Sequence, residues 1–208
     1  MQSQPSTNAT TFPINPIVPI NPIVPHVTQP NQPQALTPPP DIGFDFRALE
    51  AAGFSYGEIQ AMFEAEVVRL VNVIRVEHGL PPLIHSPELA KIARLRSEEI
   101  AEHRTHGHVS PVNGLEHTDY ARAMGLDMPL VGENAAFGQL TPQAAVNGWM
   151  VSTAGHREFL LSGSAGNGFT RDFRYLGVGF SFRDSDLTFS NGTSPPGRTA
   201  WTFWQMKP

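Results

Sequence analysis

Three polar side chains in the C-terminal two thirds of the chain are of the types that acid–base or metal chemistry requires. His108 begins the run HVSP, Glu133 lies at the centre of the run GEN, and His156 follows a glycine in the run GHR. Neutral imidazoles and carboxylates are common ligands of divalent ions and also line polar clefts. The chain has no cysteine, which excludes disulfide scaffolds and thiolate metal sites and leaves these residues as the strongest candidate ligands.

His108 has the most specific surroundings of the three. Pro111 stiffens the turn that follows it, and the hydroxyl of Ser110 can bond to nearby backbone, so we expect the imidazole to have a fixed direction. His103 and His106 come just before it. The three histidines taken as a group are also typical of a solvated helix C-terminus.

Glu133 and His156 each allow two interpretations. Glu133 is expected to open a short buried strand. A glutamate there is costly to bury unless it binds a cation, is paired, or accepts backbone amides as a structural carboxylate. Ser152 or Thr153 can cap a short helix whose first turn holds His156, and the positive end of that helix would lower the imidazole pKa. The alternative is that His156 is an ordinary residue of a helix cap.

Four longer helices are expected around these residues. Their apolar residues recur every three or four positions, as on one face of a helix. Two of them begin at Ser86-Pro87 and Thr141-Pro142, where a capping hydroxyl precedes proline at the first helical position. The expected helices cover about residues 59–79, 87–101, 115–124 and 142–151.

Two late segments, 175–182 and 199–206, are rich in β-branched and aromatic residues and predict strands. The polar segment between them, about 184–198, is long and is expected to be a mobile loop. Helices come first and strands last. This order favours an α+β fold with an antiparallel sheet over a parallel α/β fold.

The first 43 residues differ from the rest in composition. Residues 14–25 repeat the run INPIVP twice, and no charged residue occurs before Asp41. Regular proline favours an extended polyproline-like chain, so we expect residues 1–43 to be a disordered tail or linker and 44–208 to be one domain. The alternative is a docking strand whose Ile and Val pairs lie in a partner's apolar groove.

Charge and hydropathy exclude two classes of partner. The net charge is −5 and the basic residues form no stripe, so a nucleic-acid partner is not expected. No run of about 18 apolar residues occurs, so no membrane span is expected. We expect a monomer.

Taken in order, the motifs resemble those of the CAP superfamily, which includes cysteine-rich secretory proteins, antigen 5 of insect venoms and pathogenesis-related proteins of plants. Compact, cysteine-free members carry H-x-S-P, G-E-N, W-M-x-S-x-G-H-R, L-G-V-G and W-T-Q. The resemblance covers about residues 63–206 and implies an α-β-α sandwich, with a small antiparallel sheet between helices and a large polar cleft. The matching runs are 108–111, 132–134, 149–157, 176–179 and 201–203.

Carried over to this chain, the family's two histidines are His108 and His156, and the glutamate of G-E-N is Glu133. In several members the two histidines bind a divalent ion, often zinc. The resemblance therefore implies a metal site at these two histidines. It also implies a cleft lined by Ser110, Asn134, Ser152 and Trp149.

The chain departs from the family pattern at several positions. Larger members carry a second cleft glutamate where this chain has Ser152, and Phe159 replaces the usual asparagine. The spacing from Trp149 to His156 is one residue longer than in the compact members, and the run at 201–203 is WTF instead of WTQ. A complete set of two histidines and two glutamates is therefore not expected, so any zinc ion would be weakly bound.

Three functions are compatible with these observations. The first is a secreted, non-catalytic binding or effector module, whose His/Glu cleft holds a divalent cation or another ligand while loops contact a protein partner. The second is a zinc-dependent, peptidase-like hydrolase in which His108 and His156 hold the ion and Glu133 acts as base on a bound water. The third is a lipid- or sterol-binding protein. Its groove would be lined by aromatic side chains that otherwise form the core: Trp149, Phe159, Phe180 and Phe182.

The family is mostly extracellular, so the resemblance implies secretion. The residues after Met1 show neither the charged region nor the apolar region of a standard signal peptide.

Overall fold

The structure is a computed structural model that describes residues 36–105, 107–126, 131–162 and 173–183, and the main chain of 198–206. Most of the expected tail and nearly all of the expected loop at 184–198 lie outside these ranges. The elements in chain order are α1 (Phe46–Ala51), α2 (Tyr56–Glu77), β1 (Ile84–His85), α3 (Pro87–His103), α4 (His117–Ala123), β2 (Val131–Phe137), α5 (Pro142–Val151), α6 (His156–Leu160), β3 (Tyr175–Arg183) and β4 (Arg198–Met206).

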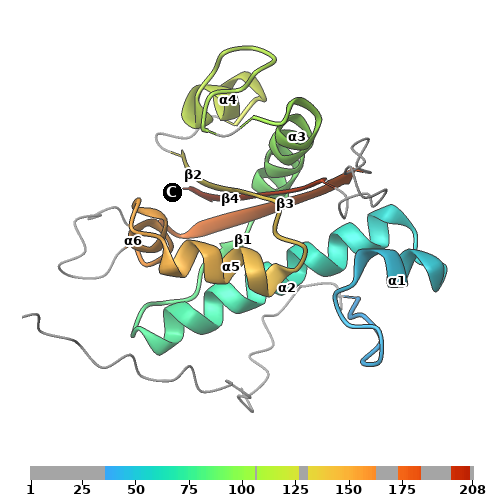
Figure 1. The fold of residues 1–208 in the computed structure, drawn as a ribbon. Helices are drawn as coiled ribbons and strands as arrows, with labels where there is room; N and C mark the ends of the chain where they lie inside the picture. The colour runs from blue at the N-terminus through green and yellow to red at the C-terminus, as the bar shows by residue number, and fades with distance from the viewer. Residues whose placement is uncertain (1–35, 106, 127–130, 163–172, 184–197, 207–208) are drawn as a thin grey trace, which may run out of the picture. The chain divides into compact units, whose positions relative to one another are not determined.

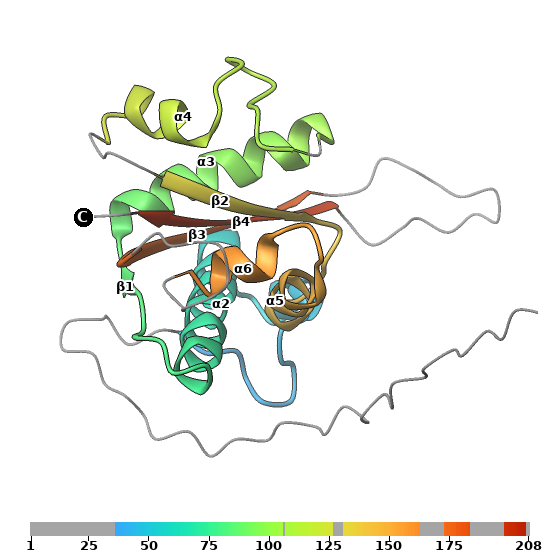
Figure 2. The ribbon, with the colours of Figure 1, turned by 90° about the vertical axis from the view of Figure 1, so that its left-hand side faces the viewer.

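The strands form one sheet in the order β1-β3-β4-β2, with helices on both faces. Helices α3 and α4 lie on one face, and α2, α5 and α6 lie on the other (Figure 1; Figure 2). This arrangement confirms the predicted α+β sandwich. The three long strands are antiparallel, but β1 adds a short parallel pair in which the N–H of Ile84 donates to the carbonyl of Arg174. A two-residue strand leaves no period-two pattern, which is why the sequence did not reveal it.

Hydroxyl caps start the long helices. Ser86 and Thr141 each accept a hydrogen bond from the backbone N–H three residues on, and proline follows each of them, as predicted. Helix α2 begins three residues earlier than expected. Ser55 caps it with Glu58 in a reciprocal capping box.

Two glycines of β3 let helix α3 lie close against the sheet. A Cβ at Gly177 would overlap the backbone of Leu89 and Ala90, and a Cβ at Gly179 would overlap the backbone of Ala93. The glycines of the run LGVG therefore have a packing role. Because they have no side chain, α3 can pack its inward face directly against the sheet.

Helix α2 covers the free edge of β3 beyond β1. The side chain of Gln60 donates to the carbonyl of Phe180 at 2.6 Å, and Glu64 accepts the N–H of the same residue at 3.1 Å. The hydroxyl of Tyr56 accepts the N–H of Phe182 at 3.1 Å. Tyr56, Gln60 and Glu64 are spaced four residues apart and lie on one face of α2, so this face of the helix follows the strand and bonds its outward backbone groups.

The four aromatic residues that we considered as a lipid groove are all buried. They belong to the main core, which lies between the sheet and the layer formed by α2, α5 and α6. Within the described residues, no helix combines the length and apolar character needed to cross a membrane.

Candidate functional site

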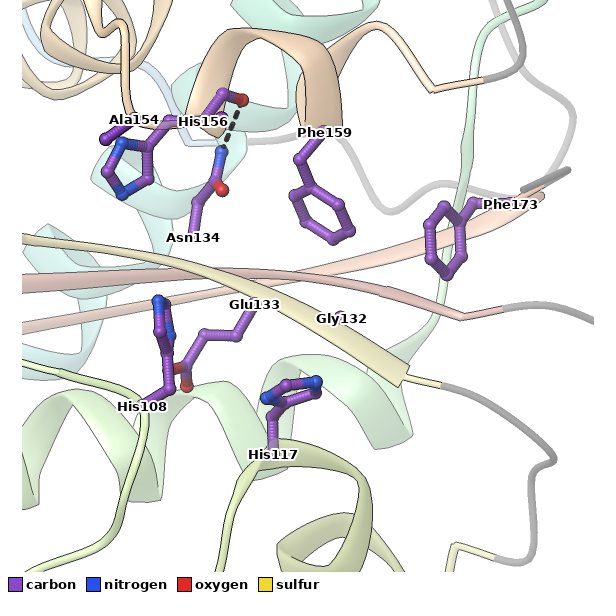
Figure 3. A pocket seen from close by; sticks show the side chains of 10 residues that line it. His108, His117, Gly132, Glu133, Asn134, Ala154, His156, Phe159 and Phe173 are labelled. Atoms are coloured by element: carbon purple, nitrogen blue, oxygen red, sulfur yellow. Dashed lines mark hydrogen bonds and ion pairs between the residues drawn. The ribbon is translucent and has the colours of Figure 1, made fainter. Parts of the chain in front are cut away.

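A pocket of about 200 Å³ lies beside strand β2, which forms one edge of the sheet. Figure 3 shows that His108, His117 and the Glu133 side chain lie on one side of the strand, while Asn134, His156 and Phe159 lie on the other. We call this the histidine pocket. Its lining residues are His108, His117, Gly132, Glu133, Asn134, Ala154, Gly155, His156, Phe159 and Phe173.

Glu133 holds His108 in place. Its Oε1 lies 2.9 Å from Nδ1 of His108, and its Oε2 lies 3.6 Å from Nε of Arg96. The side chain of Glu133 is fully buried, whereas that of His108 is 45% exposed. A carboxylate buried in this way needs a cationic neighbour, which is the guanidinium of Arg96 and, when its ring is protonated, the imidazole of His108.

Arg96 also fixes the loop that carries His108. This arginine is 1% exposed, and its NH2 group donates to the carbonyls of Gly107 at 2.8 Å and Val109 at 3.1 Å. Its NH1 lies 3.3 Å from Oε2 of Glu99. One buried guanidinium therefore connects α3, the residues on either side of His108 and the carboxylate of β2.

His156 is held from the other side of the strand. It is the first residue of α6, as predicted, but Gly155 occupies the cap position and no side chain caps this helix. Ser152 instead ends α5, and its hydroxyl lies 2.7 Å from Nδ1 of His156. The side-chain amide of Asn134 donates to the carbonyl of His156 at 3.0 Å.

The pKa values of the two imidazoles shift in opposite directions. The hydrogen bond to Glu133 raises the pKa of His108, and this effect outweighs burial. Burial lowers the pKa of His156, and the nearby charge of His108 lowers it further. The lowering predicted from a helix N-terminus has the right direction, but burial is its main cause. The pocket thus pairs an imidazole that favours its cation with one that favours its neutral form.

Four further residues were predicted to line the cleft, and the structure separates them. Asn134 lines the pocket, and Ser152 reaches it through His156. Ser110 is buried outside the lining, where its hydroxyl accepts the N–H groups of Val112 and Asn113. Trp149 is also buried, and its indole N–H donates to the carbonyl of Ala135.

Two residues of the site were not identified from the sequence. Arg96 has a readable signal, because it falls on the inward face of α3 with Ile92, Ala93 and Ile100, where a charged residue needs a partner. His117 has no such signal. It begins α4, and its ring centroid lies 6.1 Å from that of His108, in edge-to-face orientation.

The side chains around the pocket offer few ligands to a zinc ion. In the part of the chain that the structure describes, no group of three or more His, Cys, Asp and Glu side chains is placed to share one metal. Glu133 contacts His108 through Nδ1 and is therefore behind that ring, in the position of a carboxylate that orients a histidine ligand. These residues do not fit a zinc centre with three or four protein ligands.

Sequence comparisons relate the chain to known proteins. The model of the cysteine-rich secretory protein family, CAP, matches residues 68–189. A Bacillus subtilis protein called YkwD is 34% identical over 118 residues, which are 57% of this chain and 42% of that protein. The Bacillus subtilis membrane protein YlbC is 35% identical over 122 residues, 59% of this chain and 32% of that protein. The chain therefore spans less than half the length of these curated relatives.

Solved structures show the same fold. An extracellular protein of Bacillus anthracis that contains an SCP domain superposes with a TM-score of 0.57 at 25% identity, over 74% of this chain and 44% of that one. An outer surface protein of Borrelia burgdorferi superposes with a TM-score of 0.50 at 17% identity, over 69% of this chain and 92% of that one. With the family model matching more than half of its residues, the chain belongs to the cysteine-rich secretory protein (CAP) family.

Proposed function

We propose that this domain is an extracellular binding module that holds a small polar ligand, such as a divalent cation or a carboxylate, in the histidine pocket. The observation that carries the proposal is the placement of His108 and His156 around one pocket, each held through Nδ1 by a neighbouring side chain. A neutral imidazole can bind a cation, and a protonated one can bind an anion. The extracellular location rests on the Bacillus anthracis relative, which is described as extracellular.

The same contacts favour binding over hydrolysis. A general base must reach a water or substrate in the pocket, but the carboxylate of Glu133 is fully enclosed by His108 and Arg96. The hydrolase hypothesis assigned this role to Glu133. Its side chain is better placed to orient His108 and to raise the pKa of that imidazole.

Lipid binding has less support from the packing. Of the four aromatic side chains considered for it, only Phe159 also lines the pocket, and all four are buried in the core. A pocket of about 200 Å³ is also smaller than the roughly 300–1,000 Å³ of typical small-molecule sites.

Two probes test the proposal on the full chain. Zinc titrated by calorimetry at pH 7.5 tests the neutral imidazoles, and acetate titrated at pH 6 with NMR detection tests protonated His108. We expect weak binding of one ion of each kind, lost in His108→Ala/His156→Ala. The control variant His78→Ala/His103→Ala removes two exposed histidines outside the pocket and should bind both probes as wild type does.

The proposal fails if neither probe binds to the wild-type chain. It also fails if the His108→Ala/His156→Ala variant binds both probes as tightly as the wild-type chain, because the ligands would then lie elsewhere. If acetate binds and zinc does not, the pocket is an anion site and the cation is excluded.

A further inference from the structure

The hydrogen-bond pattern of the sheet determines which peptide groups of β2 face outward. The N–H and C=O groups of the even-numbered residues of β3 point toward β1, since the N–H of Ser86 donates to the carbonyl of Leu176. Odd-numbered residues of β3 therefore pair with even-numbered residues of β4, as Gly177 does with Trp204. Odd-numbered residues of β4 then pair with even-numbered residues of β2. The peptide groups of the odd-numbered residues of β2 are left facing away from the sheet.

Four positions of β2 face outward, namely 131, 133, 135 and 137, and the carbonyls of two of them are bonded by side chains of the flanking helices. The hydroxyl of Thr118 in α4 donates to the carbonyl of Val131 at 3.0 Å. The indole of Trp149 in α5 donates to the carbonyl of Ala135 at 3.2 Å. Both contacts agree with the alternation derived from the sheet. The outward peptide group between them is that of Glu133.

The peptide group of Glu133 opens into the histidine pocket. The residue as a whole is 7% exposed, but its side chain is 0% exposed, so the accessible surface belongs to its main chain. Glu133 is also one of the lining residues of the pocket. Among the described residues, no side chain bonds to its N–H or C=O. The pocket therefore presents one backbone donor and one backbone acceptor side by side.

We propose that the histidine pocket binds a short peptide segment in extended conformation, whose main chain pairs with the N–H and C=O of Glu133 and whose paired residue is acidic. The inference rests on the proposed function, because it names the class of ligand that the same pocket takes. A peptide residue carries the matching donor and acceptor at the required spacing, as in strand addition to a sheet edge.

The capped positions on either side limit the length of the segment. Val131 and Ala135 are roughly 13 Å apart along a strand, and their outward carbonyls are already bonded to Thr118 and Trp149. A long strand from a second copy of this chain would need those groups as partners. A short segment needs only the peptide group of Glu133.

The flanking side chains favour an acidic residue at the paired position. Directly opposite residues of an antiparallel pair project their side chains to the same face. The ligand side chain opposite Glu133 would therefore point toward His108 and His117, while its neighbours would point toward His156 and Phe159 (Figure 3). His108 contacts the buried carboxylate of Glu133 through Nδ1, so its other ring nitrogen is the one left for a ligand group.

The test uses the ¹⁵N-labelled full chain and acetylated, amidated tripeptides of the form Thr-Xaa-Thr, in which Xaa is Asp, Asn or Lys. A fourth peptide carries N-methyl-Asp at the centre and lacks the N–H that would donate to the carbonyl of Glu133. We expect saturable shifts of the Glu133 amide at pH 6, with the Asp peptide binding most tightly. N-methylation should weaken binding at least tenfold.

Three outcomes would overturn the inference. The first is that no peptide shifts the Glu133 amide at millimolar concentration, although zinc or acetate binds, which leaves the proposed function intact. The second is equal binding of the N-methylated and parent peptides, which means that side chains alone make the contact. The third is a shift of the Glu133 amide on concentrating the chain without peptide, which assigns the position to a second copy.

Discussion

Nδ1 of His108 lies 2.9 Å from Oε1 of Glu133, a carboxylate that is fully buried at the edge of the sheet. The carboxylate cannot move without losing this contact or its approach to Arg96. The direction of the imidazole is therefore set by a residue of β2 and by the helix that packs beneath it.

Replacing Glu133 with glutamine should lower the pKa of His108. The amide keeps a hydrogen-bond acceptor but lacks the negative charge that favours the imidazolium. An NMR titration of the imidazole signals measures the change. Glu116→Gln is the matched control, because Glu116 is the weakest of the contributions that raise the pKa of His108. Equal effects of the two substitutions would contradict the central role of Glu133.

The same pair makes stability depend on pH. A histidine whose pKa is raised in the folded state stabilises the fold fully below its ordinary pKa of about 6.5, and this contribution is lost as pH rises through the folded value. Urea unfolding of wild type and Glu133→Gln at pH 5.5 and pH 8.5 measures this. The free energy of unfolding of wild type should exceed that of Glu133→Gln by more at pH 5.5 than at pH 8.5. A difference that is larger at pH 8.5 would exclude this linkage.

Substituting Arg96 with methionine should destabilise the fold by about 3–5 kcal/mol. The change leaves the buried carboxylate of Glu133 without its nearest guanidinium and removes the donors that hold the loop carrying His108. Arg122→Met is the control, since Arg122 forms an exposed pair with Asp119 worth about 0–1 kcal/mol. Urea unfolding compares the two, and similar losses would mean that burial of Arg96 carries no special weight.

Gly179→Ala should destabilise the fold by about 1–3 kcal/mol, because the Cβ of the alanine would overlap the backbone of α3 at Ala93. Gly148→Ala is the opposite case. Gly148 is exposed within α5 and its Cβ would contact only the side chain of Gln139, so alanine should stabilise by about 0.5–1 kcal/mol. Thermal unfolding of both variants should give shifts of opposite sign. Shifts of the same sign would refute the packing role of Gly179.

Glu64 provides a second pH dependence. Burial raises the pKa of this carboxyl to about 7, even though Arg94 and the N–H of Phe180 oppose the shift. Because this pKa is raised in the folded state, the stability that the protonated carboxyl contributes is fully present below about pH 4.5 and is lost as pH rises through 7. The glutamine of Glu64→Gln cannot ionise. The free energy of unfolding of this variant, relative to that of wild type, should therefore rise between pH 4.5 and pH 8, by on the order of 2–3 kcal/mol. Urea unfolding of both proteins at pH 4.5 and pH 8 measures this change. A difference in unfolding free energy that stays constant between the two pH values would exclude the raised pKa of Glu64.

Local signals made most of the fold predictable. Serine or threonine before proline marked the starts of α3 and α5, and the three-to-four spacing of apolar residues marked α2. The order of motifs identified the family and, with it, the sandwich. These signals lie within single elements, where sequence spacing is equivalent to spatial spacing.

The pocket was harder to predict, because its residues come from elements that are far apart in the sequence and local spacing does not indicate which of them meet. Ser152 or Thr153 could have capped the helix of His156, but Gly155 occupies the cap position and the hydroxyl of Ser152 lies beside the ring of His156. His117 lines the pocket because α4 folds over β2, and nothing near it in the sequence indicates this. The direction of the Glu133 carboxylate likewise follows from Arg96, 37 positions earlier in the chain.

The ladder of Tyr56, Gln60 and Glu64 along β3 has a consequence for how the protein behaves in concentrated solution. An open sheet edge is a template on which other chains can add strands, and such addition leads to polymers and aggregates. On this edge the N–H and C=O of Phe180 and the N–H of Phe182 are already bonded to side chains of the same chain, and helix α2 cannot be displaced without exposing the core beneath it. The side chains of α2 thus protect the molecule against self-polymerisation at one edge, while the opposite edge leaves the N–H and C=O of Glu133 open to the pocket.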